Sequence, residues 1–130
     1  MTRILSSVLY VDDEPDIREV VEISLGLAAD LDVRTCDSGE RALELLAEVP
    51  ADIVLLDVMM PGLDGPATLA RLRADPRLAP IPVIFMTAKA LPQEIERFLS
   101  LGAVAVIPKP FDPMKLAEQV AAVWEGLDRG

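Results

Sequence analysis

The sequence predicts an α/β fold in which helices cover both faces of a five-stranded parallel sheet. The first observation is that short apolar runs alternate five times with longer stretches in which apolar residues recur at helical spacing. The second is residues 53–56, a run of four large apolar residues typical of a strand that is buried on both faces. The third is the placement of Pro, Gly and Asp, which separate the apolar runs from the helical stretches that follow them.

Each strand is predicted from a short apolar run that ends at a polar or turn-forming residue. The five runs are residues 7–11, 32–35, 53–56, 83–86 and 104–107. The proline that follows the last run, Pro108, has no N–H to donate to a neighbouring strand. We therefore expect the fifth strand at an edge of the sheet.

The helices are predicted from their starts and from their apolar faces. A proline in the first turn or an acidic cap marks the five starts, near Pro15, Asp37, Asp64, Pro92 and Asp112. Asp37 is followed three residues later by Glu40, which is the spacing of a capping box. In the last helix the apolar face consists of Leu116, Val120, Val123, Trp124 and Leu127.

Strict alternation of strands and helices favours parallel connections and the strand order 2-1-3-4-5, which is the flavodoxin-like order. The carboxyl ends of strands 1 and 3 meet where this order reverses, and open α/β sheets bind their ligands there. No linker, repeat or low-complexity stretch interrupts the sequence. We therefore expect residues 1–130 to form one domain with five helices.

The composition excludes several classes of function. The chain carries 12 Lys and Arg against 22 Asp and Glu, a net charge of −10, which argues against direct contacts with nucleic acid. It contains no histidine, which excludes Ser–His and Cys–His catalytic pairs, a histidine metal site and a phosphohistidine on this chain. The apolar runs fall short of the ~18 residues that span a bilayer, and acidic residues 12–14 interrupt the first of them. We therefore expect a cytoplasmic protein that does not insert into membranes.

Polar side chains follow four of the five predicted strands. Strand 1 leads to two of them and strands 3, 4 and 5 lead to one each, namely Asp12, Asp13, Asp57, Thr87 and Lys109. Each of them alone has an ordinary explanation as a helix cap, a turn residue or a solvated loop residue. Because the carboxyl ends of parallel strands share one edge of the sheet, their coincidence there predicts a functional site.

Three carboxylates at one edge of a sheet require a cation. Unit charges ~4 Å apart repel by ~4 kcal/mol at an effective dielectric constant near 20. Oxygen ligands without His or Cys favour Mg²⁺ or Ca²⁺ over zinc, and few carboxylates with room for water favour Mg²⁺. A main-chain carbonyl just after Asp57 would complete the protein ligands.

A carboxylate flanked by Mg²⁺, an ammonium group and a hydroxyl is suited to accept a phosphoryl group as an acyl phosphate. Asp57 is the expected nucleophile, because it alone follows a central strand and precedes a tight Pro-Gly turn. Lys109 would neutralise phosphoryl oxygens during transfer, and Thr87 would hydrogen-bond one of them afterwards.

Four segments resemble the receiver domain of bacterial two-component response regulators, a CheY-like family, and they are residues 8–14, 55–65, 86–88 and 109–111. The resemblance extends over nearly the whole chain. It implies phosphorelay signalling, in which Asp57 takes the phosphoryl group from a histidine kinase or a histidine phosphotransfer protein. It also implies that Mg²⁺ is bound by Asp13, Asp57 and the main-chain carbonyl of Met59, with Asp12 acting through water.

The resemblance further implies that Thr87 and Lys109 are switch residues and that the Lys109–Pro110 peptide bond is cis. The fourth helix, fifth strand and fifth helix would form the face that binds an unknown output protein, without turnover of an external substrate. The chain departs from the family pattern at Val106, where Tyr or Phe is usual, and at Pro108, directly before the lysine. The usual aromatic switch is therefore missing, and we expect backbone shifts around Thr87 to transmit the signal.

Other functions remain open on the sequence alone. A phosphohydrolase with an aspartyl nucleophile would place a second Asp two residues later, where this chain has Met59. A pseudo-receiver that binds partners without phosphorylation would usually lose acidic or lysine residues that this chain retains. A flavodoxin-like cofactor carrier would need a Gly-rich loop where residues 12–15 are Asp-Asp-Glu-Pro. Because the sequence ends directly after the fifth helix, we expect a single-domain regulator or a receiver cut from a longer protein.

Overall fold

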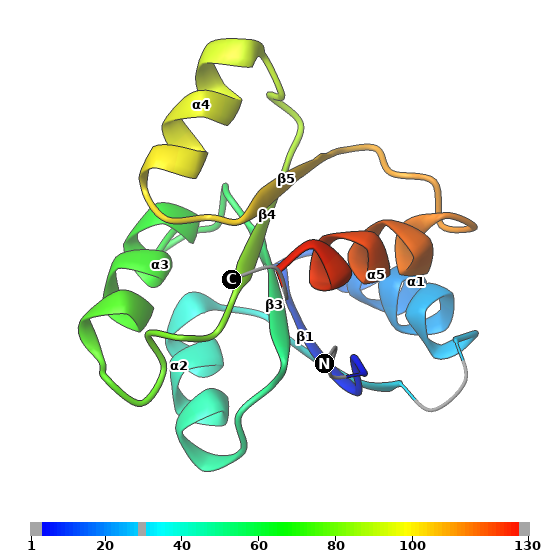
Figure 1. Cartoon of the computed structure of the whole chain (residues 1–130), viewed down its shortest axis with the longest axis horizontal. Coiled ribbons are helices and arrows are strands. Elements are labelled where there is room, and N and C mark those ends of the chain that lie inside the picture. The colour runs from blue at the N-terminus through cyan, green and yellow to red at the C-terminus, as the bar shows by residue number, and fades with distance from the viewer. Residues whose placement is uncertain (1–3, 29–30, 128–130) are drawn as a thin grey trace.

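A computed structural model describes residues 4–28 and 31–127 (Figure 1). Strands and helices alternate along these residues as the sequence predicts. The elements are β1 (Ser7–Val11), α1 (Pro15–Gly26), β2 (Asp32–Cys36), α2 (Gly39–Glu48), β3 (Ile53–Asp57), α3 (Gly65–Ala74), β4 (Val83–Thr87), α4 (Pro92–Ser100), β5 (Ala105–Pro108) and α5 (Leu116–Leu127).

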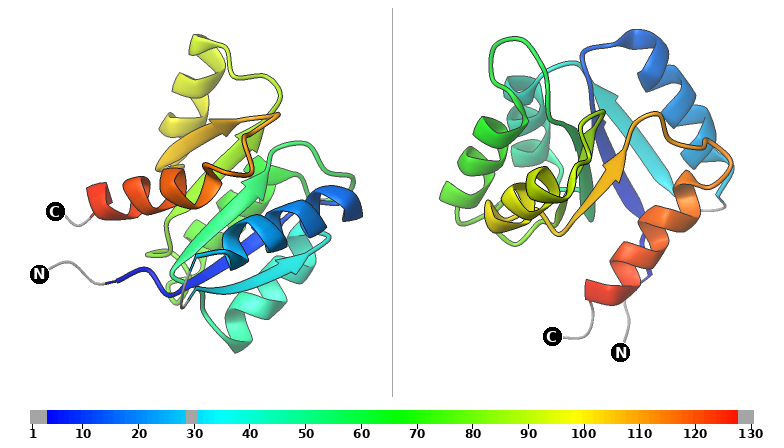
Figure 2. Two further views of the ribbon diagram at one scale, coloured as in Figure 1. Left: turned by 90° about the vertical axis from the view of Figure 1, so that its right-hand side faces the viewer. Right: turned by 90° about the horizontal axis from the view of Figure 1, so that it is seen from above.

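The five strands are parallel and lie in the order β2-β1-β3-β4-β5, which confirms the predicted α/β, flavodoxin-like architecture. Helices α1 and α5 lie side by side on one face of the sheet, and α2, α3 and α4 cover the other (Figures 1 and 2). Strand β5 lies at an edge, as the position of Pro108 predicts. The main-chain oxygen of Thr87 accepts a hydrogen bond from the N–H of Lys109, the residue after its register partner Pro108, with an N···O distance of 2.7 Å.

Alternate side chains of the central strands enter two apolar clusters, one on each face of the sheet. In β3, Val54 and Leu56 belong to the cluster under α2, α3 and α4, whereas Ile53 and Leu55 belong to the cluster under α1 and α5. All four side chains are fully buried. Burial on both faces explains why the sequence of β3 is continuously apolar rather than alternating.

The helix starts agree with the sequence at Asp64 and differ at Asp37. Asp64 is the N-cap of α3, where its Oδ1 accepts a hydrogen bond from the main-chain N–H of Ala67 at 2.9 Å. The N-cap of α2 is Ser38, whose Oγ accepts from the main-chain N–H of Arg41 at 3.1 Å. The predicted capping role of Asp37 is therefore wrong by one residue, because either a hydroxyl or a carboxylate can occupy an N-cap.

The last helix begins later than predicted and buries a narrower face. Asp112 closes a turn in which its Oδ1 accepts from the main-chain N–H of Met114 at 2.9 Å, and α5 begins only at Leu116. Leu116 and Val120 are fully buried. Leu127, predicted on the apolar face, is 38% exposed, because it lies at the end of the helix.

Arg73 connects three parts of the chain around the base of α4. Its guanidinium donates hydrogen bonds to the main-chain oxygens of Ala79, Ile81 and Gly102, at 3.0, 2.8 and 2.9 Å. The acceptors lie on the connection between α3 and β4 and on the turn before β5. Burial lowers the pKa of Arg73, but the group stays charged and its hydrogen bonds to carbonyl oxygens replace an ion pair.

Candidate functional site

The site lies where β1 and β3 end beside each other. The two strands pair in register from Val8 with Ile53 to Val11 with Leu56. The residues that follow this last pair are Asp12 and Asp57, so strand register alone brings two carboxylates to the same level. This is the point where the order of the sheet reverses and where ligands of such sheets bind.

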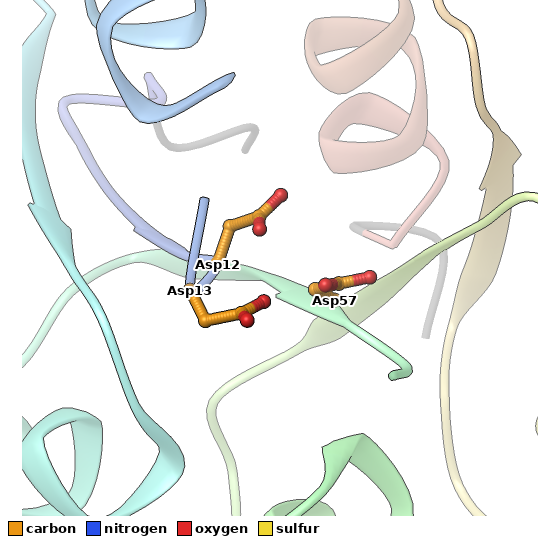
Figure 3. Close-up of side chains that lie close together, drawn as sticks. All are labelled: Asp12, Asp13 and Asp57. Carbon is orange, nitrogen blue, oxygen red and sulfur yellow. The ribbon is translucent and has the colours of Figure 1, made fainter. Parts of the chain in front are cut away.

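The three aspartates predicted from the sequence form one cluster. Asp12 and Asp13, just beyond β1, lie beside Asp57 at the end of β3 (Figure 3). One carboxylate oxygen from each residue lies within 4.8 Å of the other two. Asp12 is 0% exposed and Asp57 is 5% exposed, so two of the three charges are removed from bulk water. Such a cluster is electrostatically unfavourable unless cations neutralise it.

Lys109 supplies one of these cations. Its Nζ atom lies 2.9 Å from Asp12 Oδ2 and 3.2 Å from Asp57 Oδ1. The lysine reaches the site from the end of β5, and its side chain is only 17% exposed. The Lys109–Pro110 peptide bond is cis, as the family resemblance implies. One ammonium group is thus shared by two buried carboxylates, and the third carboxylate has no such neighbour among the described ion pairs.

The pKa values of Asp57 and Lys109 are both raised, by different causes. Burial raises the pKa of Asp57, the charge of Asp12 raises it further, and the nearby ammonium of Lys109 only partly opposes these effects. Burial by itself would lower the pKa of Lys109, but its hydrogen bond to Asp12 and the charges of both carboxylates outweigh it. Both directions follow from the surroundings of each group. Lys109 faces two opposite charges, which favour its charged form, whereas Asp57 is buried and faces one like charge as well as one opposite charge.

Sequence reasoning missed Tyr10, which contacts the site from inside the apolar core. Its hydroxyl donates a hydrogen bond to Asp12 Oδ2 with an O···O distance of 2.7 Å, and its side chain is 0% exposed. Burial and the neighbouring Asp12 raise the pKa of Tyr10, so the phenol keeps its proton. A usable signal existed, because residues 10 and 12 are two apart and side chains along a strand repeat with that period.

Asp12 makes two further hydrogen bonds, and each involves a main-chain atom. Asp12 Oδ1 accepts a hydrogen bond from the main-chain N–H of Glu14 at 3.0 Å. The main-chain oxygen of Asp12 accepts another from the Arg18 guanidinium at 2.8 Å. Asp12 therefore has one defined orientation before any ligand binds.

The two remaining site residues predicted from the sequence are Thr87, at the end of β4, and Met59, in the loop after β3. Thr87 ends β4 and is 4% exposed, and its Oγ1 accepts a hydrogen bond from the main-chain N–H of Lys89 at 3.0 Å. This leaves the hydroxyl proton of Thr87 available to a further acceptor. The side chain of Met59 is 68% exposed, and its main chain acts to lower the pKa of Asp57, against the larger upward effects of burial and Asp12. The participation of the Met59 carbonyl in metal binding stays a prediction.

The start of α3 has no space for a side chain at its first residue, Gly65. A Cβ atom there would lie 2.6 Å from the main-chain oxygen of Asp57 and 2.8 Å from Cα of Val58. The main-chain N–H of Gly65 donates to the oxygen of Val58 at 3.0 Å, which closes the loop tightly. The start of α3 is therefore packed directly against the main chain of the acidic residue.

The donor set fits a hard divalent cation. Three carboxylates converge, one ammonium compensates them among the described ion pairs, and Asp13 is the most exposed of the three. Oxygen donors of this kind suit Mg²⁺, which retains several waters when it binds to proteins. Mg²⁺ bound there would neutralise the cluster and draw electron density from phosphate oxygens.

The fold and the site together define a doubly wound α/β protein with an acidic cluster at its switch point. The sequence matches the response regulator receiver domain over residues 8–121, and the chain belongs to this family. It is 34% identical to the DNA-binding dual master transcriptional regulator RpaA of Synechocystis over 94% of this chain and 50% of that protein. It is 39% identical to a probable cyclic di-GMP phosphodiesterase of Vibrio cholerae over 80% of this chain and 23% of that protein.

A solved structure has the same fold. The chemotaxis protein CheY4 of Vibrio cholerae superposes with a TM-score of 0.84 and 28% sequence identity, over 92% of this chain and 99% of that one. By contrast, the chain spans about half or less of the length of the curated relatives it matches.

Proposed function

We propose that this chain is a phosphorylatable receiver in a two-component phosphorelay, with Asp57 as the phosphoryl acceptor. The observation that carries the proposal is the shared ammonium of Lys109, which contacts Asp57 and Asp12 at once while a third carboxylate completes the cluster. An ion pair built only for stability would need one carboxylate. The surplus of negative charge suits a site that binds a divalent cation and then a phosphoryl group.

In the proposed reaction, an oxygen of Asp57 attacks the phosphorus of a phosphohistidine on a partner protein. The new P–O bond forms as the P–N bond breaks, and the leaving imidazole takes up a proton. Mg²⁺, bound by Asp13, Asp57 and the carbonyl of Met59 with Asp12 acting through water, would supply charge neutralisation for the phosphoryl oxygens.

Two further side chains of this chain act on the product. The ammonium of Lys109, 3.2 Å from Asp57 Oδ1, moves from the carboxylate to an oxygen of the phosphoryl group. The hydroxyl of Thr87, whose proton is available, donates to a second phosphoryl oxygen and so draws the end of β4 toward Asp57. The phosphorylated state thus differs from the free state in the position of Thr87.

The partners follow from the same proposal. The phosphoryl donor is a histidine kinase or a histidine phosphotransfer protein, because this chain has no histidine of its own. The output protein binds the face formed by α4, β5 and α5. In and next to α4, Leu91, Leu99 and Leu101 are between 45% and 56% exposed. Val106, half-buried at the centre of this face, packs against the cluster under α4 and lacks an aromatic ring to rotate. Movement of the main chain at Thr87 therefore carries the signal.

We further propose that residues 1–130 act as one receiver unit, that it turns over no external substrate, and that it acts in the cytoplasm. The described part of the chain contains no helix long and apolar enough to cross a membrane. The regularity of the five β–α units supports the assignment of one unit.

The test is phosphorylation by acetyl phosphate with Mg²⁺, followed by intact mass. We expect one phosphoryl adduct in the wild type, its loss in EDTA and its loss in Asp57→Asn. Asp75→Asn is the matched control, because Asp75 carries the same group in an exposed ion pair with Arg77, outside the site. An adduct that survives Asp57→Asn contradicts the acceptor assignment. Release of many phosphates per protein from a phosphate ester would instead favour a phosphohydrolase, and no adduct in any condition would favour a pseudo-receiver.

A further inference from the structure

The carboxylate of Asp12 has its hydrogen-bonding positions occupied in an unusual way. Oδ1 accepts from the main-chain N–H of Glu14 at 3.0 Å. Oδ2 accepts two bonds, from the hydroxyl of Tyr10 at 2.7 Å and from Nζ of Lys109 at 2.9 Å. A neutral donor from the core and a charged donor from β5 therefore share one oxygen atom.

We propose that Tyr10 is a positioning residue, which keeps Asp12 hydrogen-bonded when Lys109 leaves it for the phosphoryl group on Asp57. This inference rests on the proposed function, because it concerns the lysine movement that phosphorylation requires. It assigns to a residue of the apolar core a part in the chemistry at the edge of the sheet.

The packing of the Tyr10 ring fixes the position of its hydroxyl. Its ring is fully buried in the cluster under α1 and α5, beside side chains such as Val21, Leu25 and Met86. A buried tyrosine hydroxyl requires a hydrogen-bond partner, and the carboxylate of Asp12 is its described acceptor. Because Tyr10 is held by packing, its hydroxyl stays on Oδ2 whether or not Lys109 is there.

Lys109, by contrast, can move. Its side chain enters the site from a loop, retains 17% exposure and lies between Asp12 and Asp57. When its ammonium turns fully toward Asp57, Asp12 Oδ2 loses a charged donor at a position that is 0% exposed. A buried charged oxygen that loses its only donor is strongly penalised, whereas one that keeps a charge-assisted bond is not. The hydroxyl of Tyr10 therefore lowers the energetic cost of the lysine movement.

The substitution that isolates this effect is Tyr10→Phe, which removes the hydroxyl and keeps the ring. We expect the rate of phosphorylation by acetyl phosphate at saturating Mg²⁺ to fall about tenfold, which corresponds to about 1.4 kcal/mol. The matched control is Ser7→Ala, which removes another hydroxyl from the same strand. The hydroxyl of Ser7 accepts a bond from the main-chain N–H of Asp52 at 2.9 Å, at the opposite end of β1.

A spectroscopic readout separates positioning from a merely structural role. Tyr10 is the only tyrosine in the chain, so tyrosine labelled with ¹³C at Cζ gives one resonance. We expect this resonance to shift in Lys109→Met relative to wild type without Mg²⁺ or phosphodonor, because the two side chains share Asp12 Oδ2. In the wild type it should shift again upon phosphorylation.

The outcomes distinguish this inference from the proposed function. If the wild type is never phosphorylated, the proposed function fails, whereas the resonance in Lys109→Met still tests the shared oxygen. A phosphorylation rate in Tyr10→Phe within twofold of wild type overturns the inference, as does an equal loss of rate in Ser7→Ala. An unchanged tyrosine resonance in Lys109→Met overturns it even if Tyr10→Phe does not fold.

Discussion

Removal of the ammonium of Lys109 should destabilise this protein far more than removal of a surface charge, and Mg²⁺ should reverse much of the effect. The substitution is Lys109→Met, which keeps an unbranched side chain of similar length. Lys109 lies 2.9 Å from Asp12 Oδ2 and 3.2 Å from Asp57 Oδ1. At an effective dielectric constant near 20, each contact corresponds to roughly 5–6 kcal/mol of attraction before desolvation is subtracted.

The net effect is smaller than this attraction, because burial of the ammonium opposes it. Breaking a buried ion pair by removing one partner typically costs about 3–5 kcal/mol. Asp57 can relieve part of the cost by taking up a proton, since its pKa is already raised by burial and by Asp12. We therefore expect Lys109→Met to lower the free energy of unfolding by about 3 kcal/mol at neutral pH in EDTA.

The measurement is urea unfolding of wild type, Lys109→Met and Lys115→Met, each in EDTA and in Mg²⁺. Lys115 is exposed in the turn before α5, and its loss should change the free energy of unfolding by less than ~0.5 kcal/mol. Addition of Asp57→Asn to Lys109→Met should restore part of the lost stability, since one unpaired carboxylate disappears. A loss below about 1 kcal/mol for Lys109→Met, or a loss unaffected by Mg²⁺, would refute the argument that the cluster requires a cation.

Three further perturbations test the packing at the start of α3, the charge of Asp57 and the proposed output face. Gly65→Ala should lower the free energy of unfolding by about 1–3 kcal/mol in urea titrations, because its Cβ would lie 2.6 Å from the main-chain oxygen of Asp57. Gly126→Ala in α5 should be neutral or stabilising, since a Cβ there meets no atom within 4 Å. Folded Asp57 binds its proton more tightly than the unfolded chain does, since burial raises its pKa. In EDTA the wild type should therefore lose stability relative to Asp57→Asn as the pH rises through that raised pKa, and parallel profiles would contradict this. Val106→Tyr should alter the lifetime of the acyl phosphate at least about twofold and change the free energy of unfolding by less than ~1 kcal/mol, whereas an unchanged lifetime would count against β5 as part of the signal route.

The acidic cluster was predictable because it depends on topology and not on side-chain detail. Parallel strands end at a common edge, so Asp12 and Asp57 were placed together once the order of β1 and β3 was inferred. The same argument placed Lys109, which follows β5, at this edge of the sheet. The family resemblance added the cis peptide bond at Lys109–Pro110, which no pattern of apolar residues predicts.

The contacts that the sequence did not predict all depend on distances across the folded chain. The sequence placed Tyr10 in an apolar strand, and only the structure shows that its hydroxyl lies 2.7 Å from Asp12 Oδ2. Nothing in the sequence indicated the contacts of Arg73, whose acceptors lie up to 29 positions away in the chain. Leu127 fitted the helical period of α5, but periodicity does not reveal where the covering surface ends.

The hydrogen bond from the main-chain N–H of Lys109 to the main-chain oxygen of Thr87 couples the positions of the two proposed switch residues. In a parallel ladder a main-chain oxygen accepts from the residue that follows its register partner. For Thr87 the partner is Pro108 and the donor is Lys109, so the missing N–H of Pro108 does not interrupt this bond. A displacement of Thr87 is therefore transmitted directly to the main chain of Lys109, whose ammonium contacts Asp57. Phosphorylation of Asp57 would therefore affect both the amide proton and the ammonium group of Lys109. The hydrogen-exchange rate of this one amide should report whether the end of β4 has moved.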